Sequence, residues 1–260
     1  MLQRWVERVS QLRGRILGLG PPDDLGLYAS RYEFHALRSS RAMSVGGADF
    51  DSVGALELGL LQQEGLVQGQ ALLDLGCGVG RLARHVIPVL GEGGRYVGSD
   101  ISRLMLRDAK RVIGEDAPGA VCSGEWLQQR RHRLPLEDES FDFVSAFSVF
   151  THIEHEDALG QLRDAFRVTR PGGRMLFSCL PIELAGARDV FLGSAKNNVR
   201  ARWLVGPRNM VTTREFMEWI AQLSGWKSLR WYDGETANIR HPSDGSLHAL
   251  GQSTCVLERP

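Results

Sequence analysis

The chain has 260 residues, which is enough for one large domain or two small ones. Hydrophobic residues make up 43% of it and charged residues 24%, both near the globular average, which argues against wholesale disorder. The 31 basic and 31 acidic residues balance, so a domain that binds nucleic acid mainly by neutralising phosphates is disfavoured.

Cysteine spacing and apolar runs exclude several further classes. The four cysteines are far apart and form no CxxC pair, so zinc-ribbon and thioredoxin-like sites are excluded and no metal is expected. Apolar residues lie beside all four cysteines, which suits buried free thiols in a reducing compartment. No apolar run approaches the roughly 18 residues of a membrane span, and the arginine-rich first 20 residues do not resemble a secretory signal. The expected location is therefore the cytoplasm.

Residues 1–69 are predicted to form a helical extension or cap. An apolar stripe that begins at Leu2 and Trp5 predicts a first helix, with arginines on another face. A second helix is predicted over 53–64, ended by Gly65. The basic helix could make weak contact with an anionic membrane surface, or it could pack on its own domain or on a partner.

Residues 70–260 are predicted to form the main domain, an α/β fold with a seven-stranded, mostly parallel sheet and helices on both faces. Short apolar runs alternate with helical patterns up to about residue 180. Residues 181–211 show little periodicity, and a connection of this length is typical of a lid or binding loop. The predicted strands are 71–75, 94–99, 119–123, 141–147, 173–179, 227–232 and 253–258, and the first predicted helices lie near 80–90, 102–113 and 157–168.

A glycine-rich turn follows the first predicted strand, in the segment LLDLGCGVGRL. Gly76, Gly78 and Gly80 would let the backbone pass close to a ligand, and the following helix offers free N–H groups. The dinucleotide pattern G-x-G-x-x-G fails because Arg81 occupies its last position, and no Gly-Lys-Ser/Thr follows for a phosphate loop.

Two acidic residues flank this turn. Asp74 could meet a cationic group, such as the amino group of an amino-acid-like ligand. Asp100 ends the second predicted strand, where an acid can accept both hydroxyls of a ribose. The pattern therefore indicates a ligand with an amino acid at one end and a nucleoside at the other.

This constellation resembles the class I S-adenosylmethionine-dependent methyltransferases over about residues 50–260. LLDLGCGVGRLARHV is similar to their first motif, YVGSDIS to the acidic second, LPLEDESFDFVSAFSVFTHI to the fourth-strand motif and RVTRPGGRMLFS to the fifth. For the third motif, the candidate contacts to adenine are Glu125 and Trp126. The resemblance implies S-adenosylmethionine as cofactor, bound by Asp74, Gly76, Cys77, Gly78, Gly80, Asp100, Ile101, Glu125, Trp126 and Ser148.

Methyl transfer requires alignment of donor and acceptor, with a general base when the acceptor is a hydroxyl. His152 or His155 could be that base, or either could cap a helix or lie at the surface. Candidate acceptor contacts are Tyr28, Tyr32, Arg200 and Trp203.

The favoured function is methylation of oxygen or nitrogen on a small-molecule or sugar-like acceptor. The alternatives are an RNA or protein methyltransferase, or a catalytically silent regulator that binds S-adenosylmethionine. A nicotinamide-dependent oxidoreductase is disfavoured by Arg81. The sequence leaves the oligomeric state open.

Overall fold

The computed structural model describes Leu25, Tyr28, Cys122 and residues 49–116, 124–196 and 209–260. The first predicted helix lies outside these described residues, as do Tyr32, Arg200 and Trp203. No helix within the described ranges is long and apolar enough to cross a membrane. Within the same ranges, no group of three or more His, Cys, Asp or Glu side chains is placed to hold a metal ion.

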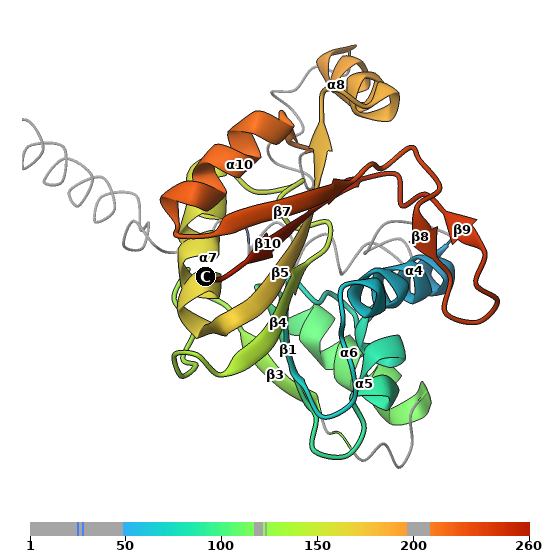
Figure 1. Ribbon diagram of the computed structural model, residues 1–260, viewed down its shortest axis with the longest axis vertical. Coiled ribbons are helices and arrows are strands. Elements are labelled where there is room, and N and C mark those ends of the chain that lie inside the picture. Colours follow the sequence, from blue (N-terminus) through green and yellow to red (C-terminus); the bar gives the residue numbers. More distant parts are fainter. Residues whose placement is uncertain (1–24, 26–27, 29–48, 117–121, 123, 197–208) are drawn as a thin grey trace, which may run out of the picture.

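A seven-stranded sheet forms the centre of the molecule (Figure 1), in the order β3-β2-β1-β4-β5-β10-β7. The first five of these strands pair in parallel, and β10 is antiparallel to both of its neighbours. The predicted mostly parallel, seven-stranded α/β sheet is therefore confirmed. A short strand β6 (Val211–Thr212) pairs with the end of β5. The seven strands are β1 (Ala71–Leu75), β2 (Arg95–Asp100), β3 (Gly124–Gln128), β4 (Phe141–Ala146), β5 (Thr169–Pro181), β7 (Lys227–Tyr232) and β10 (Ser253–Glu258).

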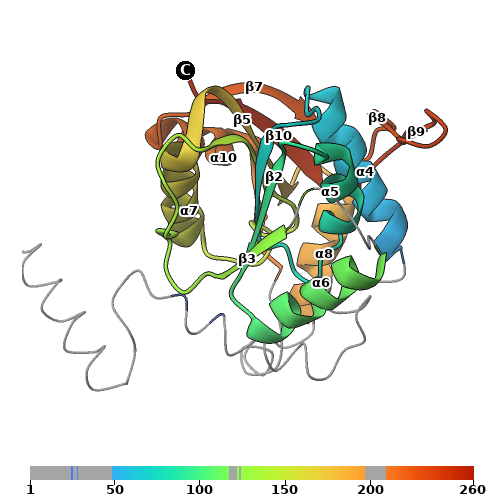
Figure 2. The same ribbon diagram turned by 90° about the horizontal axis from the view of Figure 1, so that it is seen from below.

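Helices cover both faces of this sheet, as Figure 2 shows. On one face lie α4 (Phe50–Gln63), α5 (Ala83–Leu90) and α6 (Arg103–Asp116), and on the other α7 (His155–Val168) and α10 (Arg214–Leu223). Each face has its own apolar cluster, one containing Leu60 and Ile87, the other Leu162 and Trp226. Burial on both faces explains why all five residues of β1 are buried and why the inner strands read as continuous apolar runs.

The structure adds detail to three segments of the chain. The third strand of the sheet is Gly124–Gln128, a partly buried edge strand, and the segment 119–123 that was expected to form it lies outside the described residues except for Cys122. The connection 181–211 contains α8 (Ala185–Lys196), a helix whose Phe191 and Leu192 are more than half exposed and leave no clear apolar stripe. The stretch 233–252 contains a hairpin of β8 (Ile239–Arg240) and β9 (Leu247–His248).

Candidate active site

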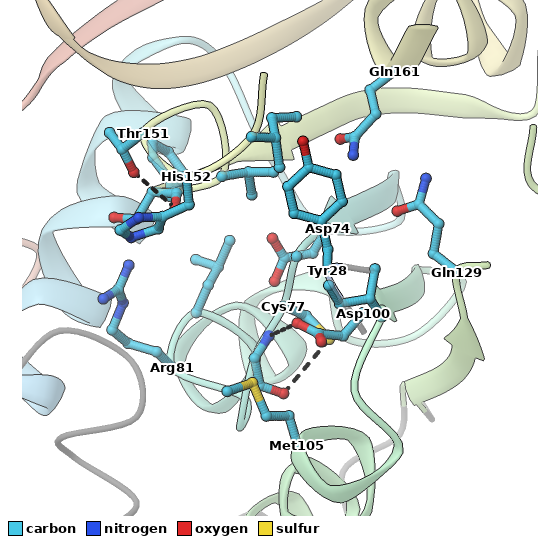
Figure 3. Close-up of a pocket in the computed structure, with 18 of the residues that line it drawn as sticks. Tyr28, Asp74, Cys77, Arg81, Asp100, Met105, Gln129, Thr151, His152 and Gln161 are labelled. Atoms are coloured by element: carbon cyan, nitrogen blue, oxygen red, sulfur yellow. Dashed lines mark hydrogen bonds between the residues drawn. The ribbon is translucent and has the colours of Figure 1, made fainter. Parts of the chain in front are cut away.

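A cavity of about 410 Å³ opens where the parallel strands end (Figure 3). Its walls come from the turn after β1, the end of β2, the segment after β4, and the two described residues that precede α4. Ligands of α/β sheets bind at this edge of the strands, because the turns there carry free backbone groups and helix N-termini. The volume lies within the range of small-molecule sites.

The turn after β1 has a backbone that only glycine adopts readily. Gly76 has φ +67° and Gly78 φ +55°, both in the left-handed region. A Cβ at Gly76 would lie 2.5 Å from Cγ2 of Val149, and both glycines line the cavity. The amide of Cys77 donates to the carbonyl of Ser99 at 3.0 Å, which holds the turn against β2. The turn therefore presents bare backbone to the cavity.

The carboxylate of Asp100 lies beside this turn, as Figure 3 shows. It accepts hydrogen bonds from the backbone amides of Gly78 at 3.0 Å and Ser102 at 2.8 Å. Only 7% of the residue is exposed, and it lines the cavity together with Ile101. The two amides fix the orientation of the carboxylate, so the side chain is positioned before any ligand arrives.

Asp74 is a second carboxylate in the cavity wall, and it is almost fully buried. It accepts hydrogen bonds from the hydroxyls of Tyr96 at 2.8 Å and Ser145 at 2.9 Å. Desolvation raises the pKa of Asp74 to about 7, although these two hydrogen bonds oppose the rise. The nearby charge of Glu57 raises the pKa further and that of Arg81 lowers it. A cation bound against Asp74 would stabilise its ionised form.

Ser148 and Gln252 belong to a polar cluster in the cavity wall. Ser148 has φ +60°, an uncommon backbone angle for a residue with a side chain. Its amide donates to Oγ of Ser178 at 2.7 Å, and this hydroxyl donates to Oε1 of Gln252 at 2.7 Å. Nε2 of Gln252 donates back to Oγ of Ser148 at 3.1 Å. Thr151 and His152 line the cavity from the turn that follows.

The two described residues before α4 close one side of the cavity. The amide of Leu25 donates to the carbonyl of Arg130 at 2.9 Å. The hydroxyl of Tyr28 donates to Oδ2 of Asp157 at 2.6 Å and accepts from the amide of Glu154 at 3.1 Å. Desolvation and the bond to Asp157 raise the pKa of Tyr28, so its hydroxyl stays protonated as a donor. Tyr28, one of the candidate acceptor contacts, thus lines the cavity.

Comparison with known proteins explains this arrangement. A family model described as a methyltransferase domain matches residues 73–177. The ubiquinone/menaquinone biosynthesis C-methyltransferase of Salmonella paratyphi B is 30% identical over 183 residues, covering 65% of this chain and 71% of that protein. The chain belongs to the class I S-adenosylmethionine-dependent methyltransferases. Its fold and its cofactor follow from that membership.

Solved structures support the fold of this methyltransferase. The magnesium protoporphyrin IX methyltransferase of Synechocystis PCC 6803, with bound SAH, superposes with a TM-score of 0.63 at 18% identity, covering 91% of this chain and 100% of that one. A SAM-dependent methyltransferase from Methanosarcina mazei gives a TM-score of 0.58 at 16% identity, covering 76% and 96%. At these identities the likeness concerns the fold alone.

The described residues of the methyltransferase fit S-adenosylmethionine. A desolvated acid, Asp74, suits its ammonium group, and the two bare glycines leave room for its chain. Asp100 is oriented to accept hydroxyl donors, as a ribose would supply. When bound, this cofactor supplies a methyl group activated on a sulfonium.

The two candidate adenine contacts of the third motif, Glu125 and Trp126, do not line the cavity. Glu125 lies within β3, where half of its side chain is exposed and Oε1 accepts from Nε of Arg95 at 3.0 Å. The ring of Trp126 packs on Tyr96 at 5.5 Å between centroids, and neither residue lines the cavity. Gln129, one residue beyond β3, is buried and lines the cavity instead. The misplaced strand boundary hid Gln129, which is one of the lining residues that the sequence analysis did not name.

The two candidate histidines also separate. His152 lines the cavity, and Figure 3 shows its ring in the wall near Thr151 and Arg81. His155 begins α7, and its ring packs edge-on against Phe216 at 4.9 Å, outside the cavity lining. Of these two histidines, His152 alone belongs to the cavity lining.

Protonation of Asp74 should make stability depend on pH. The folded-state pKa, about 7, lies above the ordinary value of 3.8, so the folded protein holds this proton more tightly than the unfolded chain. The contribution of Asp74 to stability is therefore complete below pH 3.8 and is lost as the pH rises towards 7, at no more than about 1.4 kcal/mol per pH unit. Urea unfolding from pH 4 to 8 should show this decline in the wild type.

The variant Asp74→Asn isolates this effect, because burial also raises the pKa of Glu57 and adds to the wild-type decline. The unfolding free energy of the wild type minus that of the variant should fall as the pH rises to 7. If the unfolding free energies of the two proteins changed in parallel from pH 4 to 8, Asp74 would already be ionised in the folded state over that range.

Proposed function

We propose that the protein transfers the methyl group of S-adenosylmethionine to a small, ring-bearing acceptor with a phenol- or quinol-type hydroxyl. The observation that carries the proposal is the apolar part of the cavity lining. Phe147, Val149 and Leu180 belong to that lining, which also contains His152. Such walls suit a flat carbon ring better than the sugar-like acceptor that the sequence left open.

The relative's activity favours the same class of acceptor. The Salmonella protein is named as a C-methyltransferase of ubiquinone/menaquinone biosynthesis, and quinols carry ring hydroxyls. Removal of a proton from such a hydroxyl makes both the oxygen and the neighbouring ring carbon nucleophilic. The proposal therefore includes methylation at carbon as well as at oxygen, which widens the sequence expectation of oxygen or nitrogen.

His152 is proposed as the general base. Its imidazole takes the acceptor's hydroxyl proton, and the acceptor then supplies the electron pair of the new bond to the methyl carbon. The electron pair of the broken carbon–sulfur bond remains on sulfur. The Ser148, Ser178 and Gln252 cluster has amide and hydroxyl groups with which to orient a second oxygen of the acceptor.

His152→Asn tests this role. General-base catalysis contributes about 10²- to 10⁴-fold, so kcat with a phenolic acceptor should fall by about that factor while donor affinity stays nearly constant. His155→Asn is the matched control, because His155 lies outside the cavity lining and should leave kcat unchanged. Equal losses in both variants, or none in His152→Asn, would contradict the assignment.

The acceptor class is tested by transfer of radiolabelled methyl groups. Quinols and simple phenols, hexose sugars, total RNA and unfolded protein are offered in parallel. Label should enter the quinol or phenol, and magnetic resonance of the product should locate the new methyl group. Label in RNA or protein, or in sugars alone, would overturn the proposal. Donor binding without transfer to any of these acceptors would favour the silent regulator.

A further inference from the structure

A buried ion pair joins α4 to the glycine turn. Nε of Arg81 donates to Oε2 of Glu57 at 3.2 Å, and Nη2 donates to Oε1, so the pair is bidentate. The Arg81 side chain is 11% exposed and the Glu57 side chain 2%. Gly54 makes the approach possible, because a Cβ there would lie 2.5 Å from the carbonyl oxygen of Arg81. The sequence places a glycine where α4 meets the turn, and Glu57 follows one helical turn later.

Both members of this pair line the same cavity as Asp74 and the glycine turn. Among the described residues of that lining, Arg81 is the one arginine or lysine. Figure 3 shows the Arg81 side chain directed towards the ring of His152. Nε and Nη2 of the guanidinium both donate to Glu57, so the pair fixes the plane of the guanidinium in the cavity wall.

A buried ion pair of this kind is weak evidence for a purely structural role. Replacing such a pair with apolar residues is often neutral or stabilising, because the attraction only offsets the desolvation of the two charges. The pair here lies in a cavity wall that already contains two other acids, Asp74 and Asp100. An arginine at this place suits a ligand carboxylate, which it can bind with two parallel hydrogen bonds.

We propose that Arg81 binds the carboxylate of the amino-acid end of the methyl donor, and that Glu57 is a positioning residue that orients the guanidinium. The donor carries an ammonium and a carboxylate on one carbon, so their partners must lie close together. Asp74 and Arg81 lie at the two ends of one glycine turn, line one cavity, and are near enough for the charge of Arg81 to lower the pKa of Asp74. The inference concerns the donor and does not depend on the acceptor.

Which of two donors the protein binds more tightly separates this role of Arg81 from a purely structural one. Decarboxylated S-adenosylmethionine carries one more net positive charge than the normal donor. Three acids, Glu57, Asp74 and Asp100, line the cavity against one arginine, so general electrostatics favours the decarboxylated form. A preference for the normal donor therefore requires a group that binds its carboxylate.

The experiment measures equilibrium binding of both donors by calorimetry. The wild type should bind S-adenosylmethionine about 10- to 100-fold more tightly than the decarboxylated form, as expected for hydrogen bonds between charged groups. Arg81→Gln should lose this ratio, mainly by weaker binding of the normal donor. Arg84→Gln is the control. Arg84 lies three residues after Arg81 and outside the cavity lining, so this variant should retain the wild-type ratio.

Three further variants keep the test valid if Arg81→Gln folds poorly. The double variant Glu57→Gln with Arg81→Gln leaves no unpaired buried charge and should also show no preference for the normal donor. Glu57→Gln alone keeps the arginine but loses its charged partner, so the ratio should fall part of the way. Glu57→Asp keeps the charge and should lie nearer the wild type.

Each result decides the proposal. A wild type that binds the two donors equally overturns it, as does an Arg81→Gln variant that keeps the wild-type ratio. Equal weakening of both donors in the variants would assign the pair a structural role only. A changed acceptor KM with an unchanged donor ratio would move Arg81 to the acceptor site and overturn the proposal as well.

Discussion

Gly78→Val is expected to abolish binding of S-adenosylmethionine while the fold is retained. Gly78 has φ +55°, and a β-branched side chain in this region costs about 1–2 kcal/mol in backbone strain alone. The residue also lines the cavity, so the added methyl groups occupy the space beside the bare backbone. Its amide donates to Asp100 at 3.0 Å, and a shift of the turn would disturb that carboxylate too. Calorimetry with the donor measures the loss.

Gly172→Val is the matched control for backbone strain. Gly172 has φ +77°, and a Cβ there meets nothing within 4 Å among the described residues. It lies in β5, outside the cavity lining. The control should lower the melting temperature by an amount similar to Gly78→Val and leave donor affinity unchanged. Normal donor binding in Gly78→Val would mean that the backbone of the turn does not approach the donor.

Asp100→Ala is expected to weaken donor binding by about 1.5–3 kcal/mol or more, the free energy of hydrogen bonds to a charged group. We attribute this loss to the ribose hydroxyls, which an acid at the end of the second strand is placed to accept. The variant also leaves the amides of Gly78 and Ser102 without their acceptor, so its unfolding free energy should fall. Calorimetry and urea unfolding measure the two effects separately.

Two comparisons separate the contact to ribose from the effect on the turn. Asp100→Asn keeps an oxygen for one of the amides, so it should be more stable than Asp100→Ala yet still bind the donor weakly. Asp108→Asn changes a partly exposed acid on α6, whose ion pairs lie at the surface, and should alter neither quantity. Donor affinity that survives in Asp100→Asn would show that the negative charge contributes nothing to binding.

The sequence by itself determined the sheet and the donor end of the site, because both depend on local patterns. Inner parallel strands are buried on both faces, and their apolar runs are visible without any partner. The turn from Asp74 to Gly80 combines an acid with glycines at alternate positions, and Asp100 ends the next strand. Each signal lies within a few residues, so spacing alone predicted that these side chains would meet at one edge of the sheet.

Only the tertiary structure decided which other side chains reach that edge. Gln129 follows an edge strand whose partial burial leaves a weak pattern, so the strand was misplaced and Glu125 was chosen instead. Gln252 contacts Ser148 across 104 residues, because β10 inserts antiparallel beside β5. Glu57 meets Arg81 through the packing of α4 on the turn. Contacts between distant segments arise from the burial of whole helix and strand faces, and no short stretch of sequence encodes which side chains that packing brings together.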